Sequence, residues 1–334
     1  MENTYQTGVI MHEIDPDGDM ILTLKNPCAP FAVWHEDDAT PLPTSLDLSS
    51  QEPQGSDLNC SDEIIGLAPT SSAVTYRISS RHLSSASERS RKMRHQWEQK
   101  RESDGYFHIS VEDWDSEALL AILNIIHLRN RQVPHEVSLE MLSKLAVIVD
   151  YFEFHEAVEV FSKTWIADLQ GSLPTSYCRD LILWMWISHV FHEEDILKTV
   201  ICTAVRHSLG WMEDLGLPIP EHIISQVDDR RREAAVQLVD GLRALKEGLQ
   251  YGTKACSYEC QCRFLGALIK GLDHFHVFDS TFEPLLGCGL TEVIKSTRQL
   301  RIPARSGRSS CDCTMNNLTY PFLGKVENDL RRLA

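Results

Sequence analysis

The stretch YRISSRHLSSAS, residues 76–87, decides the fold that this sequence predicts. Tyr76 and Ile78 alternate with polar neighbours, which is the period of a strand with one buried face. The serine-rich remainder carries a single leucine, Leu83, and indicates a polar helix that continues to about residue 100. A short strand that turns at once into a polar helix needs a sheet to pack against, and we expect Leu83 to anchor the helix there.

Two other segments have the same strand-like character. DMILTL, residues 19–24, is apolar and lies between an Asp-Gly pair and an Asn-Pro pair. GYFHISV, residues 105–111, begins at an Asp-Gly turn signal. PFAVW, residues 30–34, either continues the pairing of the first strand or starts another short one. Residues 37–73 are rich in Pro, Ser, Asp and Gly, so we expect a flexible insertion there.

From residue 115 onward the pattern becomes helical. Asp115 and Ser138 stand where a side chain can accept hydrogen bonds from the exposed amides of a helix start. A second helical half follows Gly171 and Pro174 and includes a long helix over residues 228–249. The apolar residues recur at the spacing of one helix face, and those expected to be buried are Leu119, Ile122, Leu123, Ile126, Leu142, Leu145, Ala146, Val149, Ala157, Val160, Phe161, Trp165, Ala235, Leu238, Val239, Leu242 and Leu245.

Composition bounds the class of protein. The 334 residues are 43% apolar and 24% charged, and the formal net charge is −16. This acidity disfavours non-specific attraction to nucleic acid or to an anionic membrane. The first residues show none of the features of a secretory signal, so we expect none, and no apolar stretch approaches the ~20 residues of a membrane span. We therefore expect an intracellular protein of the cytoplasm or nucleus, with its ten cysteines mostly as thiols.

The order of these elements resembles the BTB/POZ fold. The family's pattern has an aromatic residue, a small apolar residue two positions on, a leucine seven on and a serine eleven on. Tyr76, Ile78, Leu83 and Ser87 match it, with Met93 at a further apolar position. DWDSEALLAILNIIH and LSKLAVIVDYFEFHEAVEVF resemble the family's later helices. Together with DPDGDMILTL and NPCAPFAVW, these segments look like the BTB-domain proteins of filamentous fungi.

The resemblance implies an α+β protein with a small sheet capped by helices and a mainly α-helical C-terminal region. The expected limits are a tail over residues 1–14, a BTB/POZ-like domain over 15–170, a helical extension over 174–300 and a cysteine-containing tail over 301–334. The implied function is a non-catalytic adaptor or scaffold that binds protein partners. Self-association and a cullin-type ligase scaffold are the open alternatives, and we expect no membrane, nucleic acid or small-molecule substrate.

The sequence also departs from the family pattern. Ser79 stands where many members have histidine, and Ser90 where an aromatic residue usually packs. The insertion separates two strands that usually form a tight hairpin. We see no additional N-terminal helix and strand of the kind used in swapped dimers, so dimerisation by that route is not expected.

The cysteines near the C-terminus are the candidate metal ligands. They are Cys256, Cys260, Cys262, Cys311 and Cys313. Structural zinc needs four N or S ligands, usually presented as pairs such as C-x₂-C. The spacings here are C-x₃-C, C-x-C and C-x-C, which favour ordinary thiols. A zinc-binding regulatory protein is therefore the alternative function, and no other cofactor is indicated.

Two further patterns have structural interpretations. Trp184 and Trp186 beside His189 and His192 favour a buried core over a ligand site, because the histidines lack the H-E-x-x-H order. The basic run between residues 81 and 101 is either a solvated helix face or a positive stripe for an acidic partner or nuclear import. No nucleophile elbow, phosphate loop or dinucleotide motif is present. The sequence therefore indicates no catalytic residues.

Overall fold

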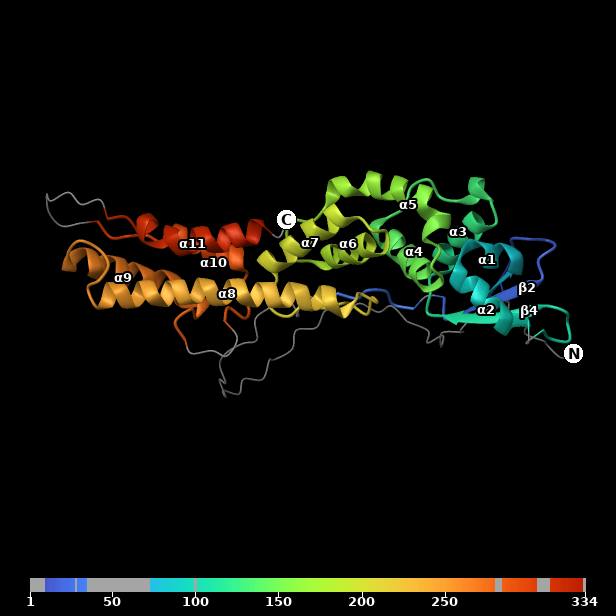
Figure 1. The fold of residues 1–334 in the computed structure, drawn as a ribbon, viewed down its shortest axis with the longest axis horizontal. Helices are drawn as coiled ribbons and strands as arrows, with labels where there is room; N and C mark the ends of the chain where they lie inside the picture. Colours follow the sequence, from blue (N-terminus) through green and yellow to red (C-terminus); the bar gives the residue numbers. More distant parts are fainter. Residues whose placement is uncertain are drawn as a thin grey trace, which may run out of the picture. The chain divides into compact units, whose positions relative to one another are not determined.

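The computed structural model describes residues 10–27, 29–34, 73–98, 101–279, 284–304 and 313–332. The protein is mixed α+β and mostly helical, with one small sheet among these residues. The chain forms two compact units, which we describe separately (Figure 1). Unit 1 comprises Met1–Ala29 and Leu42–Val133, and unit 2 comprises Pro30–Pro41 and Pro134–Ala334. The expected limit at residues 170–174 falls inside unit 2, and the assignment of residues 15–170 to one domain stays a prediction.

Unit 1 is built on a four-stranded sheet in the order β1-β3-β2-β4. The strands are β1 Ile10–Glu13, β2 Met20–Lys25, β3 Val74–Ile78 and β4 Phe107–Glu112. β2 pairs antiparallel with β3 and parallel with β4, and β1 pairs parallel with β3. The strands predicted at 19–24, around Tyr76 and Ile78, and at 105–111 are therefore confirmed, and they join edge to edge.

Two predictions about strands are wrong. Residues 30–34 form no strand and belong to unit 2, where the Arg179 guanidinium donates to the carbonyls of Ala32 and Phe31 at 2.7 and 3.2 Å. The tail expected over residues 1–14 contains β1. Its sequence, IMHE, shows no buried alternation because both faces are largely exposed. β1 forms because it pairs with β3, which is distant in sequence. The pattern of its own four residues therefore does not predict it.

Unit 1 also contains the helices α1 Ser80–Ala86, α2 Glu88–Glu98 and α3 Ser116–Ile126. The single polar helix expected after β3 is thus two helices, because Ser87 adopts extended backbone and ends α1. Leu83 is fully buried, as expected. Asp115 caps α3 by accepting from the amides of Glu117 and Ala118, which confirms that prediction.

Asp19, just before β2, fixes the start of α1 against the sheet. Its carboxylate accepts from the Ser80 amide and the Ser80 hydroxyl, both at 2.8 Å. Burial raises the pKa of Asp19, but the two hydrogen bonds from Ser80, together with its own backbone amide and the charge of Arg101, leave the pKa below its ordinary value. The ionised form is therefore the one that holds α1.

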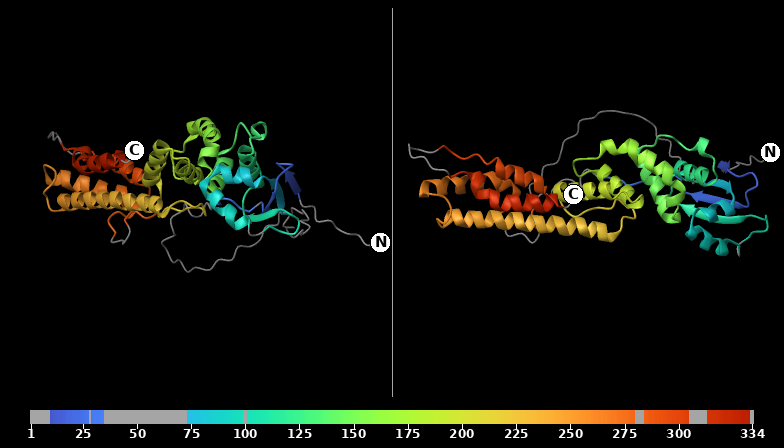
Figure 2. Two further views of the ribbon diagram at one scale, coloured as in Figure 1. Left: turned by 45° about the vertical axis from the view of Figure 1, so that its right-hand side comes forward. Right: turned by 45° about the horizontal axis from the view of Figure 1, so that its top comes forward.

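Unit 2 is helical. Figure 1 shows α8 beside α9 and α11. The two views in Figure 2 show the same helices side by side, and α8 packs against both. Its α-helices among the described residues are α4 Leu139–Phe152, α5 His155–Leu169, α6 Arg179–Val190, α7 Glu194–His207, α8 Glu221–Gln250, α9 Tyr258–Leu272, α10 Leu290–Arg298 and α11 Met315–Arg331.

The burial expected in these helices is largely confirmed. All five expected residues of α8 are buried, and Trp184 and Trp186 of α6 are fully buried. Ser138 caps α4 by accepting from the Met141 amide. The prediction fails in α5, where 77% of the Val160 surface is exposed and Val158 is buried instead. Ala157 and Phe161 of the same helix are only half-buried.

Arg231 of α8 is a buried cation that joins two loops of unit 2. Its guanidinium donates to the carbonyls of Ser208, Leu209, Leu285 and Cys288, at 2.8–3.2 Å. A charged group in a low-dielectric interior needs such dense hydrogen bonding. This side chain therefore ties the loop after α7 and the loop before α10 to the long helix.

The turn before β2 leaves no room for a side chain at Gly18. A Cβ atom there would lie 2.5 Å from the Ile78 carbonyl oxygen, and backbone atoms of β3 cannot move aside. We expect Gly18→Ala to lower the free energy of unfolding of unit 1 by about 2 kcal/mol, a typical cost of overpacking. Gly171→Ala is the matched control, because open space surrounds Gly171. Equal denaturation curves for the two variants would contradict the geometry of this turn.

Candidate interaction site

β1 and β4 are the two edges of the sheet in unit 1, and β4 is bridged at its first residue. The start of β4 is covered, because Arg101 forms an antiparallel bridge with Phe107 and the Glu102 amide donates to the Tyr106 carbonyl at 3.2 Å. β1, the other edge, pairs with β3 on one side only among the described strands. An unprotected edge presents unpaired backbone N–H and C=O groups and is a template for another strand.

The direction of the β1 backbone identifies the groups that face outward. The Ile14 amide, just past the strand, donates to the Arg77 carbonyl of β3 at 3.1 Å. Backbone groups alternate in direction along a strand, so the amide of His12 also faces β3 and those of Met11 and Glu13 face away. The side chains of Ile10 and Met11 are 55% and 56% exposed. The edge thus combines outward-facing donors with apolar side chains.

Three side chains hold β1 in place. The His12 ring stacks on Tyr76, with ring centroids 5.2 Å apart. Arg77 donates to the Glu13 carboxylate at 3.0 Å, and Arg129 donates to the Glu13 and Ile14 carbonyls at 3.1 and 3.0 Å. Arg129 therefore ends the open edge at Glu13. A strand held in this way loses little conformational entropy when a partner pairs with it.

Asp15, His82 and His127 have metal-compatible spacing, but their hydrogen bonds argue against a metal. One ligand atom from each lies within 4.8 Å of the others. His127 Nδ1 is 2.8 Å from the Leu123 carbonyl, and Nε2 is 3.0 Å from the Ser79 amide. The amide can only donate, so Nε2 accepts and Nδ1 carries the proton. The one lone pair that could bind a metal is in use, and His127 instead positions the Ser79 cap of α1.

Glu102, Asp104 and His108 form a second, exposed group of this kind. Asp104 accepts from the Tyr106 amide at 3.0 Å and lies 2.9 Å from His108 Nε2. The hydrogen bond from the Tyr106 amide is the main cause that lowers the pKa of Asp104. These contacts shape the turn that leads into β4.

The structure brings together two of the five candidate cysteines. The sulfurs of Cys256 and Cys260 are 3.7 Å apart, close to the ~3.8 Å between two thiolates on one tetrahedral zinc. Cys262 is exposed and hydrogen-bonds to Tyr258, whose pKa it raises. Cys311 lies outside the described residues, and Cys313 is half-buried. Among the described residues no three of these sulfurs form a metal-compatible group, so the zinc site stays a prediction.

The other patterns noted in the sequence have a structural role or stay open. The His189 ring is 6.2 Å from the Trp186 ring and 6.3 Å from His222, and burial is the main cause that lowers its pKa. Trp186 is core, as expected. In the basic run, Lys92 pairs with Glu88 at 3.1 Å on an exposed face. Whether this face is merely solvated or binds an acidic partner stays a prediction.

Sequence reasoning missed the exposed edge at Ile10 and Met11. The available signal was the run of apolar residues Val9, Ile10 and Met11 in an otherwise polar start of the chain. The run is too short to indicate a strand by itself.

No family model matches the chain, and no curated protein or solved structure matches it at a significant level. Among the described residues, no helix has both the length and the apolar character that a bilayer span requires.

His127 makes the stability of α1 depend on pH. Burial is the main cause that lowers its pKa, so the unfolded chain takes up a proton that the folded one resists. Stability is thus present above the unfolded pKa of about 6.5 and falls as pH decreases, by up to ~1.4 kcal/mol per pH unit. We expect lower hydrogen-exchange protection of the Ser79 amide at about pH 5.5 than at about pH 7.5, after correction for intrinsic rates.

His127→Gln should remove this pH dependence, whereas the matched variant His12→Gln should retain it. The assignment fails if Ser79 is equally protected at both pH values in the unmodified protein.

The zinc alternative is tested by elemental analysis. Structural zinc needs four ligands, and the described residues place two sulfurs at a suitable spacing. We expect purified protein to contain less than one zinc per chain, with no change in Cys256→Ser/Cys260→Ser. Stoichiometric zinc that the double variant loses would establish the site instead.

Proposed function

We propose that the chain is a non-catalytic protein-interaction module of the BTB/POZ class that acts as an adaptor or scaffold. Two features support the class. The elements of unit 1 follow the order that the resemblance implies: the antiparallel β2–β3 pair, a helical segment, the strand β4 beside β2 and the helix α3. The helical segment is divided into α1 and α2 where the resemblance implies one polar helix. Tyr76, Ile78 and Leu83, which carry the resemblance, are fully buried.

These buried residues also connect the elements of unit 1. The Tyr76 hydroxyl donates to the Ser116 carbonyl at the start of α3, at 3.0 Å. Burial raises the pKa of Tyr76, which keeps the hydroxyl protonated as a donor. The Ser87 hydroxyl accepts from the Ser90 amide at 3.0 Å and so starts α2. The positions that define the resemblance thus hold α1, α2 and α3 around the sheet.

The open β1 edge is the observation that carries the interaction function. A partner segment in extended conformation can pair with the outward-facing amides of Met11 and Glu13 and with the Met11 carbonyl, whereas the Glu13 carbonyl already accepts from Arg129. Main-chain hydrogen bonds then supply affinity, and contact with the exposed Ile10 and Met11 side chains supplies specificity. This proposal allows three kinds of partner: a protein of another kind, a second copy of this chain, or a cullin-type scaffold.

The test compares variants that differ in the outward amide. Met11→Pro removes the N–H that faces the open side and leaves the amides that face β3 intact. Met11→Ala is the matched control, because it removes the side chain and keeps the N–H. We expect affinity capture with the full chain, followed by mass measurement after size exclusion, to show a partner or a dimer that Met11→Pro loses and Met11→Ala retains at least in part.

Two outcomes count against the proposal. Equal capture by Met11→Pro and the unmodified chain would mean that the partner binds elsewhere. A strictly monomeric protein that captures nothing would oppose the adaptor function itself.

A further inference from the structure

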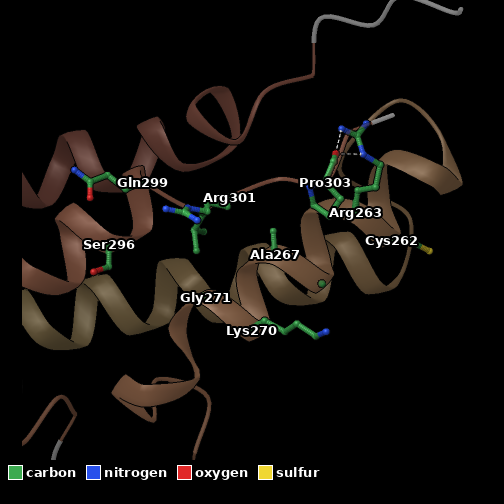
Figure 3. Close-up of a pocket in the computed structure, with 11 residues that line it drawn as sticks. Cys262, Arg263, Ala267, Lys270, Gly271, Ser296, Gln299, Arg301 and Pro303 are labelled. Atoms are coloured by element: carbon green, nitrogen blue, oxygen red, sulfur yellow. Dashed lines mark hydrogen bonds between the residues drawn. The ribbon is translucent and has the colours of Figure 1, made fainter. Parts of the chain in front are cut away.

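Unit 2 contains a pocket on the surface formed by α9, α10 and the segment that follows α10. Its volume is about 670 Å³, within the range of about 300–1,000 Å³ that is typical of small-molecule sites. Figure 3 shows residues of α9 on one side, and Ser296, Gln299 and Arg301 on the other. Nothing in the proposed interaction function uses this pocket.

The charge of the pocket is opposite to that of the protein. Arg263, Lys270 and Arg301 line it, and none of the described residues that line it is acidic. The whole chain carries a formal charge of −16. The two arginines at this hollow in an acidic protein create a local positive potential that attracts anions, while Figure 3 shows the Lys270 side chain directed away from them. The Ser296 hydroxyl and the Gln299 amide add neutral hydrogen-bonding groups.

The pocket is held in shape by contacts of its own residues. Arg263 donates from Nε and Nη2 to the Pro303 carbonyl, at 2.9 and 2.5 Å (Figure 3). These bonds use two of the five N–H groups of the guanidinium, which leaves donors for an anion. Leu300 lies against Gly271, where a Cβ atom would come within 2.1 Å of its Cδ2. The segment after α10 is therefore fixed against α9 at two points.

The floor of the pocket is apolar. Gly266, Ala267, Gly271 and Leu300 line it beside the charged groups. A Cβ atom at Gly266 would meet no other atom within 4 Å, so the hollow lies directly over this residue. A ligand that fills this pocket therefore needs an anionic group that contacts the arginines and an uncharged organic part that packs on the apolar floor.

We propose that this pocket binds a small phosphorylated organic anion of about mononucleotide size. Arg263 and Arg301 bind the phosphate oxygens, because the planar guanidinium matches phosphate in a bidentate geometry. The body of the ligand lies over Gly266 and Ala267. Such binding is independent of the sheet edge in unit 1, so either proposal can fail without the other.

Isothermal titration calorimetry on the full chain tests the proposal with three probes: adenosine triphosphate, inorganic tripolyphosphate and adenosine. We expect adenosine triphosphate to bind more tightly than tripolyphosphate, and adenosine not to bind. Arg301→Glu should weaken binding about tenfold or more, the equivalent of one charged hydrogen bond. Lys198→Glu, an exposed charge reversal on α7, is the matched control and should leave the affinity unchanged.

A second variant tests the apolar floor without changing any charge. Gly266→Leu places a side chain in the hollow, and leucine is the better helix former, so the protein should keep its stability. We expect this variant to lose binding of adenosine triphosphate while its thermal unfolding stays the same or shifts upward. Gly266→Ala, which fills much less of the space, should bind more tightly than Gly266→Leu.

Failure of both phosphate-bearing probes to bind would overturn the proposal, since both carry the group that the arginines recognise. Binding that neither Arg301→Glu nor Gly266→Leu reduces would place the ligand elsewhere and also overturn it. Equal affinity for tripolyphosphate and adenosine triphosphate, unaffected by Gly266→Leu, would reject the organic body.

Discussion

The register between β2 and β3 is the constraint on which the rest of unit 1 depends. Leu22 and Tyr76 lie opposite each other in this antiparallel pair, and both are fully buried. A shift by one residue would turn every buried side chain to the other face of the sheet. The register also places Asp19 where it caps α1 and the Tyr76 hydroxyl where it reaches α3. The packing of the sheet, the hydrogen bonds at the start of α1 and the position of the β1 edge therefore all depend on the pairing of β2 with β3.

Much of this arrangement could be predicted from local pattern. Alternating polarity predicted β3, turn signals beside short apolar runs predicted β2 and β4, and side chains able to cap a helix predicted the starts of α3 and α4. These signals are readable because the residues that cause the structure are neighbours in sequence. That β2 and β3 would pair across residues 26–73 required the resemblance to a known order of elements.

What could not be predicted depends on contacts between distant residues. β1 exists because β3 offers it a partner, and its own four residues are too exposed to show a pattern. The carbonyls that surround Arg231 come from residues 208–288, so its burial was not visible in the helical period. The pocket residues lie on α9, α10 and the segment after α10, and only folding brings these charges together. Local patterns predicted elements, whereas sites arose from tertiary structure.

The central claim is that unit 1 presents an open sheet edge at β1, and residue-resolved hydrogen exchange of the monomeric chain tests it most directly. The account predicts fast exchange for the amides of Met11 and Glu13 and slow exchange for that of His12, which faces β3. Protection of Met11 and Glu13 equal to that of His12 would mean that the edge is already covered, and would contradict the claim.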